Sequence, residues 1–395
     1  MTTKRRHTIV IAGGGTGGLT VAAQLLDHDP TLDVAVIEPS GKHYYQPIWT
    51  LVGGGVFPRE VSEREEADFI PAGATWIKDR VARFDPDQNV VHTEGGLEVE
   101  YDYLVAALGI RIDWKKIPGL AETVGRDGVV SNYSFETVES TWKAIQSLRD
   151  GNAVFTHPST PIKCGGAPLK ICLLTDDYLR KHGRRGQVKV QFFKAGPGIF
   201  AVEKYARSLR EIAAKREIET HYQWDLTELR PAAKEAVFRK VGAEEQKVVS
   251  YSMIHVTPPM GPLEVQAPLG DAGGWVDVHK HTLRHVKFPN VFALGDASNL
   301  PTSKTGAAIR KQAPVLVENL EAVLTGREPT ASYDGYTSCP LVTGYGKLIL
   351  AEFDYDNRPQ ESFPFDQSRE RYSMYALKAY GLPEFYWNGM LRGRM

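Results

Sequence analysis

Short apolar runs that stop at glycine alternate with longer helical patterns in the first part of the chain. The run HTIVIA ends at residue 12, and the helical stretch that follows its glycines continues to residue 26. Further apolar runs occupy residues 33–38, 101–109 and 151–156. Strands that alternate with helices pack as parallel sheets, so this pattern predicts an α/β fold with two Rossmann-like units.

The loop after the first strand carries the spacing G-x-G-x-x-G at Gly13, Gly15 and Gly18. The first glycine permits a tight turn, the second lets the backbone approach a pyrophosphate, and the third lets helix and strand pack closely. The next strand ends at Glu38, 20 residues after the last motif glycine (38 − 18 = 20), where an acid holds ribose hydroxyls. These features predict a dinucleotide site, which either FAD or NAD would satisfy.

Two distant segments favour FAD at this site. FPNVFALGDA at residues 288–297 predicts a short strand that ends beside Asp296, and YDYLVAALG returns the chain to Gly109. Flavoproteins with two nucleotide-binding domains carry such separated pieces of one FAD domain. The sequence therefore predicts FAD as the cofactor, with Asp296 near its ribityl or phosphate region, and it predicts no metal site.

The second Rossmann-like unit lacks the features of a nicotinamide site. After its first strand, GNAVFT, the chain continues as HPSTPIKCGGAP, where prolines and Cys164 replace a phosphate loop. A G-x-G-x-x-A spacing occurs at residues 196–201, but it follows the second strand, and Lys194 occupies the position of the ribose-binding acid. We interpret this spacing as a turn that opens the next helix.

Length and composition limit these assignments. A chain of 395 residues exceeds a single domain of roughly 100–200 residues. We expect a discontinuous FAD domain (1–112 and 275–335), a second domain (113–274) and a C-terminal segment (336–395). A net charge of −1 without long basic runs indicates no nucleic-acid partner. Three cysteines do not make a disulfide scaffold, which favours a cytosolic setting.

Two of the three cysteines lie in turn-like stretches, Cys164 in PIKCGGAP and Cys339 in TSCPLVT. Thiols that meet beside a flavin can accept a nucleophile on sulfur and pass two electrons to the ring. The reactive form is a thiolate, and Lys163 or Lys170 could supply a favourable positive field. On composition alone, two unrelated buried thiols fit equally well. Cys172, within an apolar helical run, is predicted to be an inert core residue.

Longer motifs add a family resemblance: HYYQPIWTLVGGG (43–55), PIKCGGAPLK (161–170), HVTPPMGP (255–262), GWVDV (274–278), NLPTSKTGAA (299–308), YTSCPLVTGYGKLILAEFDY (336–355) and FPFDQSRERYSMY (363–375). They resemble the sulfide:quinone oxidoreductases of the mitochondrial type, also found in bacteria, of the FAD-dependent pyridine nucleotide-disulfide oxidoreductase superfamily. The resemblance runs from about residue 8 to the end. It implies oxidation of hydrogen sulfide with two-electron reduction of a quinone, ubiquinone or menaquinone.

The resemblance also implies roles for individual residues. Cys339 would accept the sulfane sulfur as a persulfide and Cys164 would address the flavin, starting from a disulfide or a trisulfide. A small nucleophile such as glutathione, sulfite or a second sulfide would remove that sulfur. Besides Gly13, Gly18 and Gly109, the FAD contacts would be Gly14, Gly15, Glu38, Gln46, Val81, Asp296, Gly306, Ala307, Ala308 and Ile309.

The end of the chain suggests contact with a membrane. SKTGAAIRKQ predicts a helix that begins near Thr305, whose N-terminus would stabilise an anionic reduced flavin. Residues 372–395 mix aromatic side chains with Lys378, Arg392 and Arg394, as is typical of the membrane–water interface. With the resemblance, we expect this tail to dock on one leaflet and to open a path for quinone. The alternative is a helix packed on its own core or on a second subunit of a homodimer.

The ends of the chain and its hydropathy predict where the protein is located in the cell. MTTKRRHTIVIAGGG mimics a signal peptide, but its apolar part is short and we predict a buried strand. No stretch reaches the roughly 18 apolar residues that span a bilayer. Without an Arg- and Ser-rich lead, we expect a bacterial enzyme bound peripherally to the cytoplasmic face of the inner membrane, or to the mitochondrial inner membrane if eukaryotic.

The competing enzymatic hypothesis is an NADH:quinone oxidoreductase of the same fold, which would need a phosphate loop after residue 156. A flavin-binding protein without enzymatic activity would need neither thiol. Flavin bleaching by NADH would favour the first alternative. Indifference to alkylation of Cys164 and Cys339 would favour the second.

Overall fold

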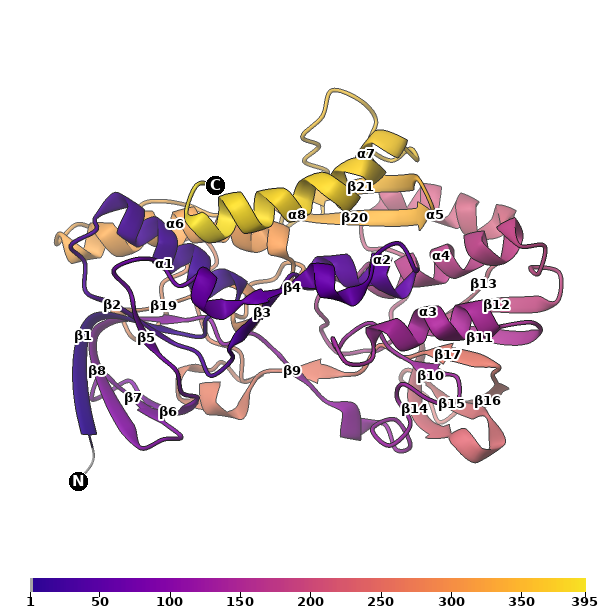
Figure 1. Cartoon of the computed structure of the whole chain (residues 1–395), viewed down its shortest axis with the longest axis horizontal. Helices are drawn as coiled ribbons and strands as arrows, with labels where there is room; N and C mark the ends of the chain where they lie inside the picture. The colour runs from indigo at the N-terminus through magenta and orange to yellow at the C-terminus, as the bar shows by residue number, and fades with distance from the viewer. Residues whose placement is uncertain (1–2) are drawn as a thin grey trace.

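The computed structural model describes residues 3–395, which form two α/β halves bridged by the C-terminal segment (Figure 1). The first half contains a seven-stranded sheet, in which β1 (Thr3–Ala12) pairs in parallel with β2 (Val34–Ile37) and β8 (Leu97–Ala106). β8 also pairs in parallel with a strand from late in the chain, β19 (Val291–Ala293). The sheet is completed by β5 (Thr75–Ile77), β6 (Val81–Asp85) and β7 (Val90–Thr93).

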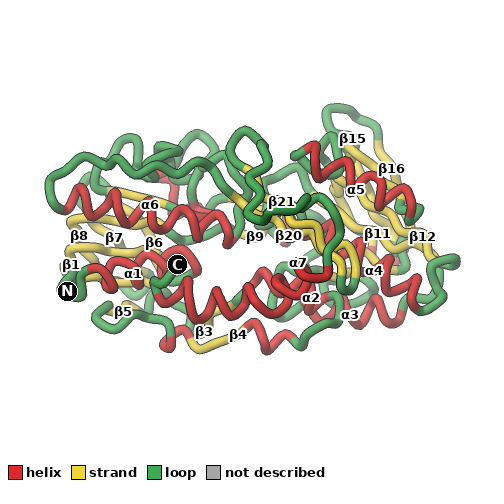
Figure 2. The backbone as a smooth tube through the Cα atoms, turned by 90° about the horizontal axis from the view of Figure 1, so that it is seen from above, coloured by secondary structure: helices red, strands yellow, loops and turns green. Residues whose placement is uncertain are grey.

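The apolar end of β1 explains how this half is built. Residues 9–12 have no exposed surface, as expected of a parallel strand that is covered on both faces. Two helices, α1 (Thr16–His28) and α6 (Gly306–Leu324), pack against each other over the sheet (Figure 2). The structure confirms the predicted buried strand before the glycine loop. It also places β19 beside β8 and α6 on α1, while the expected domain bounds stay a prediction.

The second half is built on a parallel sheet of five strands, with an antiparallel sheet of three strands beside it. Its helices α3 (Val138–Ser147), α4 (Ala167–Lys181) and α5 (Glu203–Lys215) follow strands of the parallel sheet. In spatial order the parallel strands are β10 (Val129–Val130), β17 (Met253–His255), β11 (Gly151–His157), β12 (Val188–Lys194) and β13 (Glu219–Tyr222). The antiparallel strands are β14 (Trp224–Arg230), β15 (Glu235–Lys240) and β16 (Gln246–Ser250).

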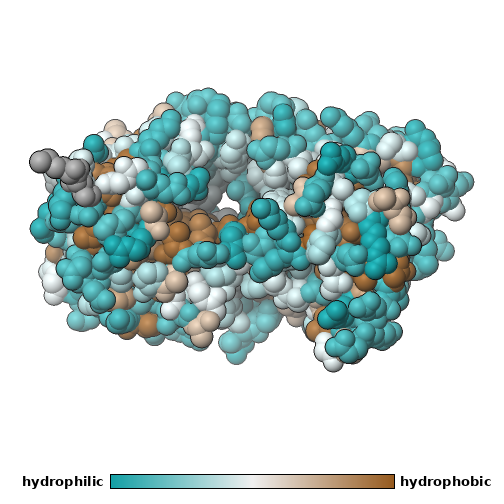
Figure 3. Space-filling model, turned by 90° about the horizontal axis from the view of Figure 1, so that it is seen from below, coloured by the Kyte–Doolittle hydropathy of each residue, from teal (hydrophilic) through white to brown (hydrophobic). Residues whose placement is uncertain are grey.

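Short elements join the two halves. The helix α2 (Trp49–Gly53), from the N-terminal part of the chain, packs against α3 and α4 of the second half. β3 (Lys42–Tyr44) pairs with β4 (Glu63–Glu65), and β9 (Arg111–Ile112) pairs with β18 (Met260–Gly261). Figure 3 shows that the molecule, seen from below, is hollowed between its halves and carries a largely hydrophilic surface.

The C-terminal segment crosses both halves. The hairpin of β20 (Thr337–Gly344) and β21 (Lys347–Phe353) packs on α4. From α7 (Tyr372–Ala376), helical turns that include α8 (Leu382–Glu384) continue to residue 392 and reach α1 (Figures 1 and 2). Within residues 3–395, no helix combines the length and apolar character needed to cross a membrane.

The aromatic tail differs in part from the expectation of a membrane-facing surface. Many of its predicted contact residues are buried against their own chain, because α7 packs on the hairpin of β20 and β21 and the last helical turn packs on α1. The buried members are Tyr375, Lys378, Tyr386, Trp387, Met390 and Leu391. Tyr372, Tyr380 and Phe385 remain 70%, 59% and 50% exposed.

Candidate active site

The loop between β11 and α4 carries Cys164 and is fixed to the first half of the molecule. The backbone N–H of Cys164 donates to the carbonyl oxygen of Lys304 at 2.8 Å, and Lys163 and Lys304 form a parallel bridge. Cys164 has a φ of 53°, in the left-handed region that a non-glycine residue rarely adopts. The thiol loop therefore lies against the segment that leads into α6.

Cys339 lies in β20 and meets Cys164 across a narrow gap. The two Sγ atoms are 3.7 Å apart and are not joined by a disulfide. Cys339 is 3% exposed, whereas Cys164 is half-buried. Gly166 lies so close to the Cys339 sulfur that any side chain there would collide with it. The structure thus brings the two predicted cysteines together, while Cys172 is fully buried in α4 as the sequence predicts.

Lys170 is the cation that faces the thiols. Its Nζ donates to Cys164 Sγ at 3.1 Å, and the side chain is buried. A hydrogen bond from Cys339 and the charge of Lys170 hold the pKa of Cys164 well below its usual value, although burial opposes this. The contact with Cys164 and burial raise the pKa of Cys339 well above its usual value. Cys164 is therefore the thiolate of the pair.

The sequence offered Lys163 for the same task, but Lys163 points elsewhere. Its Nζ donates to Gln46 Oε1 and lies 5.9 Å from the ring centroid of Trp49. Burial lowers the pKa of Lys163 to about 8. Gln46 and Lys163 thus link the first half to the thiol loop, next to Asp296.

Lys378 is a second buried amine near the thiols, and local sequence gave no signal for it. The sequence places it among surface cations, yet it is 2% exposed, and its Nζ donates to the carbonyl oxygen of Pro47 at 2.7 Å. Burial and the nearby charge of Lys170 lower the pKa of Lys378 to about 7. The C-terminal segment therefore contributes a titratable group to the surroundings of the thiol pair.

The glycine loop after β1 forms an open cradle at the N-terminus of α1. Gly13 has a φ of +104° and lies against the backbone of Ala107, and Gly18 packs on the Gly13 carbonyl. At Gly15, by contrast, an added Cβ would meet nothing within 4 Å. The N–H of Gly14 donates to Glu38 Oε2 at 2.9 Å. This cradle, with free N–H groups at a helix start, fits the pyrophosphate of FAD.

The other predicted FAD contacts are spread around the same half. Asp296 is half-buried after β19, and burial raises its pKa. Lys304 Nζ donates to the carbonyl oxygens of Asp296 and Ser298, both at 2.9 Å. Helix α6 begins at Gly306, and the side chain of Thr305 caps it by accepting from the N–H of Ala308 at 3.0 Å, which confirms the predicted helix start. Ala307 and Ile309 lie in its first turn.

Two predicted contacts have less local support. Gly109 follows β8 with a φ of +80° and open space where a Cβ would sit, as suits a close backbone approach. Val81 is a buried core residue at the start of β6. Both assignments stay predictions.

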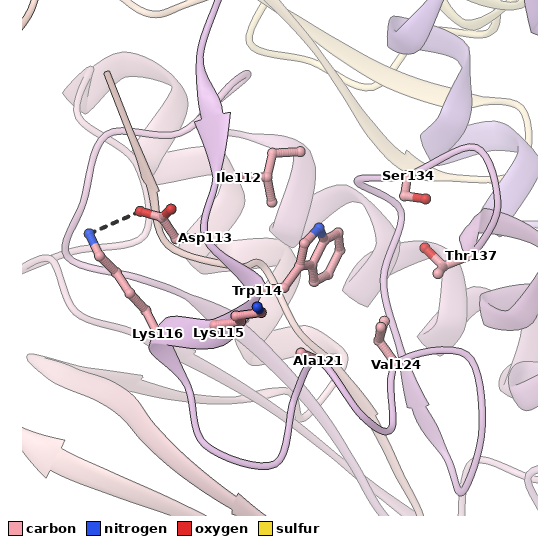
Figure 4. A pocket seen from close by; sticks show the side chains of 9 residues that line it. All are labelled: Ile112, Asp113, Trp114, Lys115, Lys116, Ala121, Val124, Ser134 and Thr137. Atoms are coloured by element: carbon pink, nitrogen blue, oxygen red, sulfur yellow. Dashed lines mark ion pairs between the residues drawn. The ribbon is translucent and has the colours of Figure 1, made fainter. Parts of the chain in front are cut away.

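The described residues also form a pocket of about 570 Å³ between β9 and the loop before α3 (Figure 4). Ile112, Trp114, Ser134 and Thr137 are among its lining residues, and Lys116 pairs with Asp113 at its edge at 3.0 Å. It shares no residue with the thiol pair or the glycine cradle.

The fold and the site define an FAD-dependent oxidoreductase of the pyridine nucleotide-disulphide class. The family described as pyridine nucleotide-disulphide oxidoreductase matches residues 7–149. The chain is 53% identical over 391 residues to the mitochondrial sulfide:quinone oxidoreductase of Dictyostelium discoideum, covering 98% of this chain and 86% of that protein. It is 49% identical to the mouse mitochondrial sulfide:quinone oxidoreductase, covering 99% and 88%.

This chain belongs to the sulfide:quinone oxidoreductase family. The crystal structure of the sulfide:quinone oxidoreductase from Aquifex aeolicus superposes with a TM-score of 0.83 at 21% identity, covering 98% of this chain and 92% of that one. Membership confirms the predicted fold class and the assignment of FAD as cofactor.

Proposed function

We propose that this protein oxidises hydrogen sulfide and reduces a quinone, using Cys164 and Cys339 as its redox pair. The proposal rests on one observation above all: two thiols far apart in sequence lie 3.7 Å apart, with the ammonium group of Lys170 on Cys164. A structural pair of buried thiols would not need a buried cation, whose desolvation is costly. A redox pair does, because the cation favours the thiolate.

Electrostatics decides which sulfur is attacked. When hydrosulfide attacks a Cys164–Cys339 disulfide, the S–S bond breaks and one cysteine leaves as a thiolate. The thiol with the lower pKa leaves faster. Because Lys170 stabilises the Cys164 thiolate, attack occurs at Cys339, which becomes a persulfide.

The cycle closes with a second sulfur transfer. A small nucleophile, such as glutathione, sulfite or another sulfide, takes the outer sulfur and leaves Cys339 as a thiolate. Re-forming the Cys164–Cys339 bond then releases an electron pair. The chemistry that bound FAD would supply is two-electron transfer from this pair to a quinone, ubiquinone or menaquinone. A trisulfide resting state would follow the same balance with one bridging sulfur more.

The residues around the cradle suit a flavin beside the thiols. Gly15 leaves room for the pyrophosphate, and Glu38 lies at the position that holds ribose hydroxyls. The N-terminus of α6 and Lys304 bring positive charge to the side on which Cys164 is anchored. The predicted contacts Gln46 and Asp296 flank the same region.

The NADH:quinone alternative has weaker support. β11 leads into the thiol loop, where Cys164 and prolines 158 and 161 stand in place of a phosphate loop. β12 ends at Lys194, whose Nζ donates to the Ile199 carbonyl at 3.4 Å. The spacing at 196–201 lies in the irregular connection between β12 and α5, as the sequence predicts, and α5 begins only at Glu203, after the motif has ended.

Quinone would be met at a membrane surface. The exposed side chains of Tyr372, Tyr380 and Phe385 lie along the C-terminal segment, and Phe57 packs on Tyr380 with ring centroids 5.8 Å apart. Aromatic side chains of this kind prefer the membrane–water interface. We extend the proposal to peripheral membrane binding through this strip, on the bacterial inner membrane or its mitochondrial counterpart, with a homodimer as a compatible state.

An anaerobic titration with sulfide tests the proposal. Sulfide should bleach the flavin absorbance of the purified holoenzyme, whereas NADH should not. Cys164→Ser and Cys339→Ser should each lower turnover at least about a thousandfold while retaining FAD. Cys172→Ser is the matched control and should still be bleached by sulfide. Turnover of either site variant at the wild-type rate would refute the role of that thiol.

A further inference from the structure

A buried chain of hydrogen bonds joins the C-terminal segment to the glycine cradle. The Tyr386 hydroxyl lies 2.7 Å from Thr16 Oγ1 and 2.6 Å from His43 Nε2. His43 Nδ1 in turn lies 2.9 Å from Glu66 Oε2. Thr16 is the first residue of α1 and directly follows Gly15. The sequence gave no signal for this chain, because its members are remote from one another.

The free end of the chain faces the cradle. Glu66 is 1% exposed, and its Oε1 has no hydrogen-bond partner among the described residues. That oxygen lies against Gly14, where any added side chain would collide with it and with Glu38. A buried carboxyl oxygen without a partner is most costly when the carboxyl group is ionised, and a proton on the other oxygen removes that charge. Burial raises the pKa of Glu66, which favours the proton.

The hydrogen bonds in this chain can be oriented in two ways. If Glu66 is ionised, His43 Nδ1 donates to it, Tyr386 donates to Nε2, and Thr16 donates to Tyr386. If Glu66 carries a proton on Oε2, every donor reverses, and the hydroxyl hydrogen of Thr16 points away from Tyr386. Only the second arrangement frees Thr16 to donate to an anion in the cradle. A phosphate in the cradle would therefore favour the second arrangement.

Other contacts hold the same end of the C-terminal segment on α1. Gln24 Nε2 donates to the carbonyl oxygen of Met395 at 2.8 Å, and Gly393 packs directly on the backbone of Ala23. The rings of Trp387 and Phe69 are in contact, with centroids 5.0 Å apart and planes tilted by 37°. Residues 386–395, hereafter the latch, thus cover the helix whose N-terminus forms the cradle.

We propose that the latch is part of the FAD site: Tyr386, held by His43 and Glu66, positions Thr16 at the cradle. Cofactor binding and docking of the latch then strengthen each other by the same factor, as linkage requires. Tyr386 and His43 are positioning residues, since they act on FAD through Thr16. The inference concerns cofactor binding and is independent of the sulfur chemistry proposed above.

The first test compares two tyrosines of the C-terminal segment. Apo-protein carrying Tyr386→Phe should bind FAD about tenfold more weakly in a fluorescence titration, the loss expected for one buried hydrogen bond with unpaired partners. Tyr375→Phe, which removes a buried hydroxyl elsewhere in the segment, should bind FAD with wild-type affinity. In the same samples, FAD should slow tryptic cleavage after Arg392 in wild type and much less in Tyr386→Phe. Equal FAD affinity of all three proteins would overturn the proposal.

A second set of variants guards against a folding defect in Tyr386→Phe. Thr16→Val removes the hydroxyl at nearly constant shape and should weaken FAD binding, whereas Thr16→Ser should restore most of it. In Thr16→Val, the further change Tyr386→Phe should have little added effect on FAD affinity. Additive losses in the double variant would show that the two residues act separately and would contradict the latch.

Discussion

The loop after β1 and the loop after β11 both connect a buried parallel strand to a helix, yet they present different chemistry. The first loop is open at Gly15, with no atom within 4 Å of an added Cβ. The second places a sulfur at its tip, on Cys164 with a φ of 53°. In both, the residue before the helix is a glycine without a side-chain cap, Gly15 before α1 and Gly166 before α4.

The difference shows that the same strand–loop–helix unit can serve different purposes, depending on the residues in its loop. In the first loop, glycines keep space free so that backbone N–H groups meet an anion. In the second, Gly166 is needed for the opposite reason, because its missing side chain lets the Cys339 sulfur approach. In the function proposed above, one unit binds the cofactor, while its counterpart holds the group that reacts with it.

Removing Lys170, the cation that faces the thiols, should have the largest effect. In Lys170→Met the pKa of Cys164 rises, so its thiolate is lost at higher pH than in wild type. The acid limb of turnover should move up by about 1–3 pH units, which lowers the rate at acidic pH by roughly ten- to a thousandfold. Steady-state rates from pH 5 to 9 measure this. Lys163→Met removes an amine that contacts Gln46 instead, so the acid limb should stay in place. An equal shift of the acid limb in Lys163→Met would contradict the assignment of Lys170.

Filling the first loop should come next. Gly15→Val should fold, because its side chain enters free space, but it should weaken FAD binding roughly a hundredfold by occupying the cradle. Gly165→Val is the matched change in the thiol loop, since an added Cβ there also meets nothing. Flavin fluorescence titration should show near-normal FAD affinity for Gly165→Val. Comparable losses of FAD affinity in both variants would mean that the two loops do not have separate roles.

A third test concerns Lys378, which lies on the C-terminal segment near the thiol pair. Burial depresses its pKa from 10.5 to about 7, so the folded state carries the cost of a buried charge below pH 7. This cost fades as pH rises from 7 towards 10.5, because the unfolded state alone then binds the proton. Lys378→Met should stabilise the protein by about 1–4 kcal/mol at pH 6, and by less at pH 9. Thermal unfolding at the two pH values should show this; a pH-independent gain would contradict it.

The smallest effect is expected at the cap of α6. Thr305→Ala removes the hydroxyl that accepts from the N–H of Ala308, and should cost about 1 kcal/mol of unfolding free energy. Thr305→Ser keeps the acceptor and should cost much less. Urea denaturation distinguishes the two. If alanine and serine behave alike, the cap contributes little.

Features encoded by neighbouring residues could be predicted from the sequence. The strand before Gly13, the burial of Cys172 and the start of α6 follow from local patterns of glycine, apolar and capping residues. Lys170 was one of two candidates because it and Lys163 flank Cys164 in sequence.

Features that depend on remote parts of the chain were not predictable in this way. Nothing near Lys378 in sequence indicates burial against Pro47, and the partners of His43 come from positions 66 and 386. The meeting of Cys164 and Cys339 needed the family resemblance, since their spacing carries no signal. Membrane contact stays a prediction, because much of the aromatic tail is used for packing.

The main-chain hydrogen bond from Cys164 to Lys304 has a mechanical consequence. It connects the Cys164 loop of the second half to the segment that leads into α6 in the first half, at the centre of the molecule. A hinge motion that separated the halves would break this bond and move Cys164, together with Lys170 on α4 and Cys339 on β20, away from the start of α6.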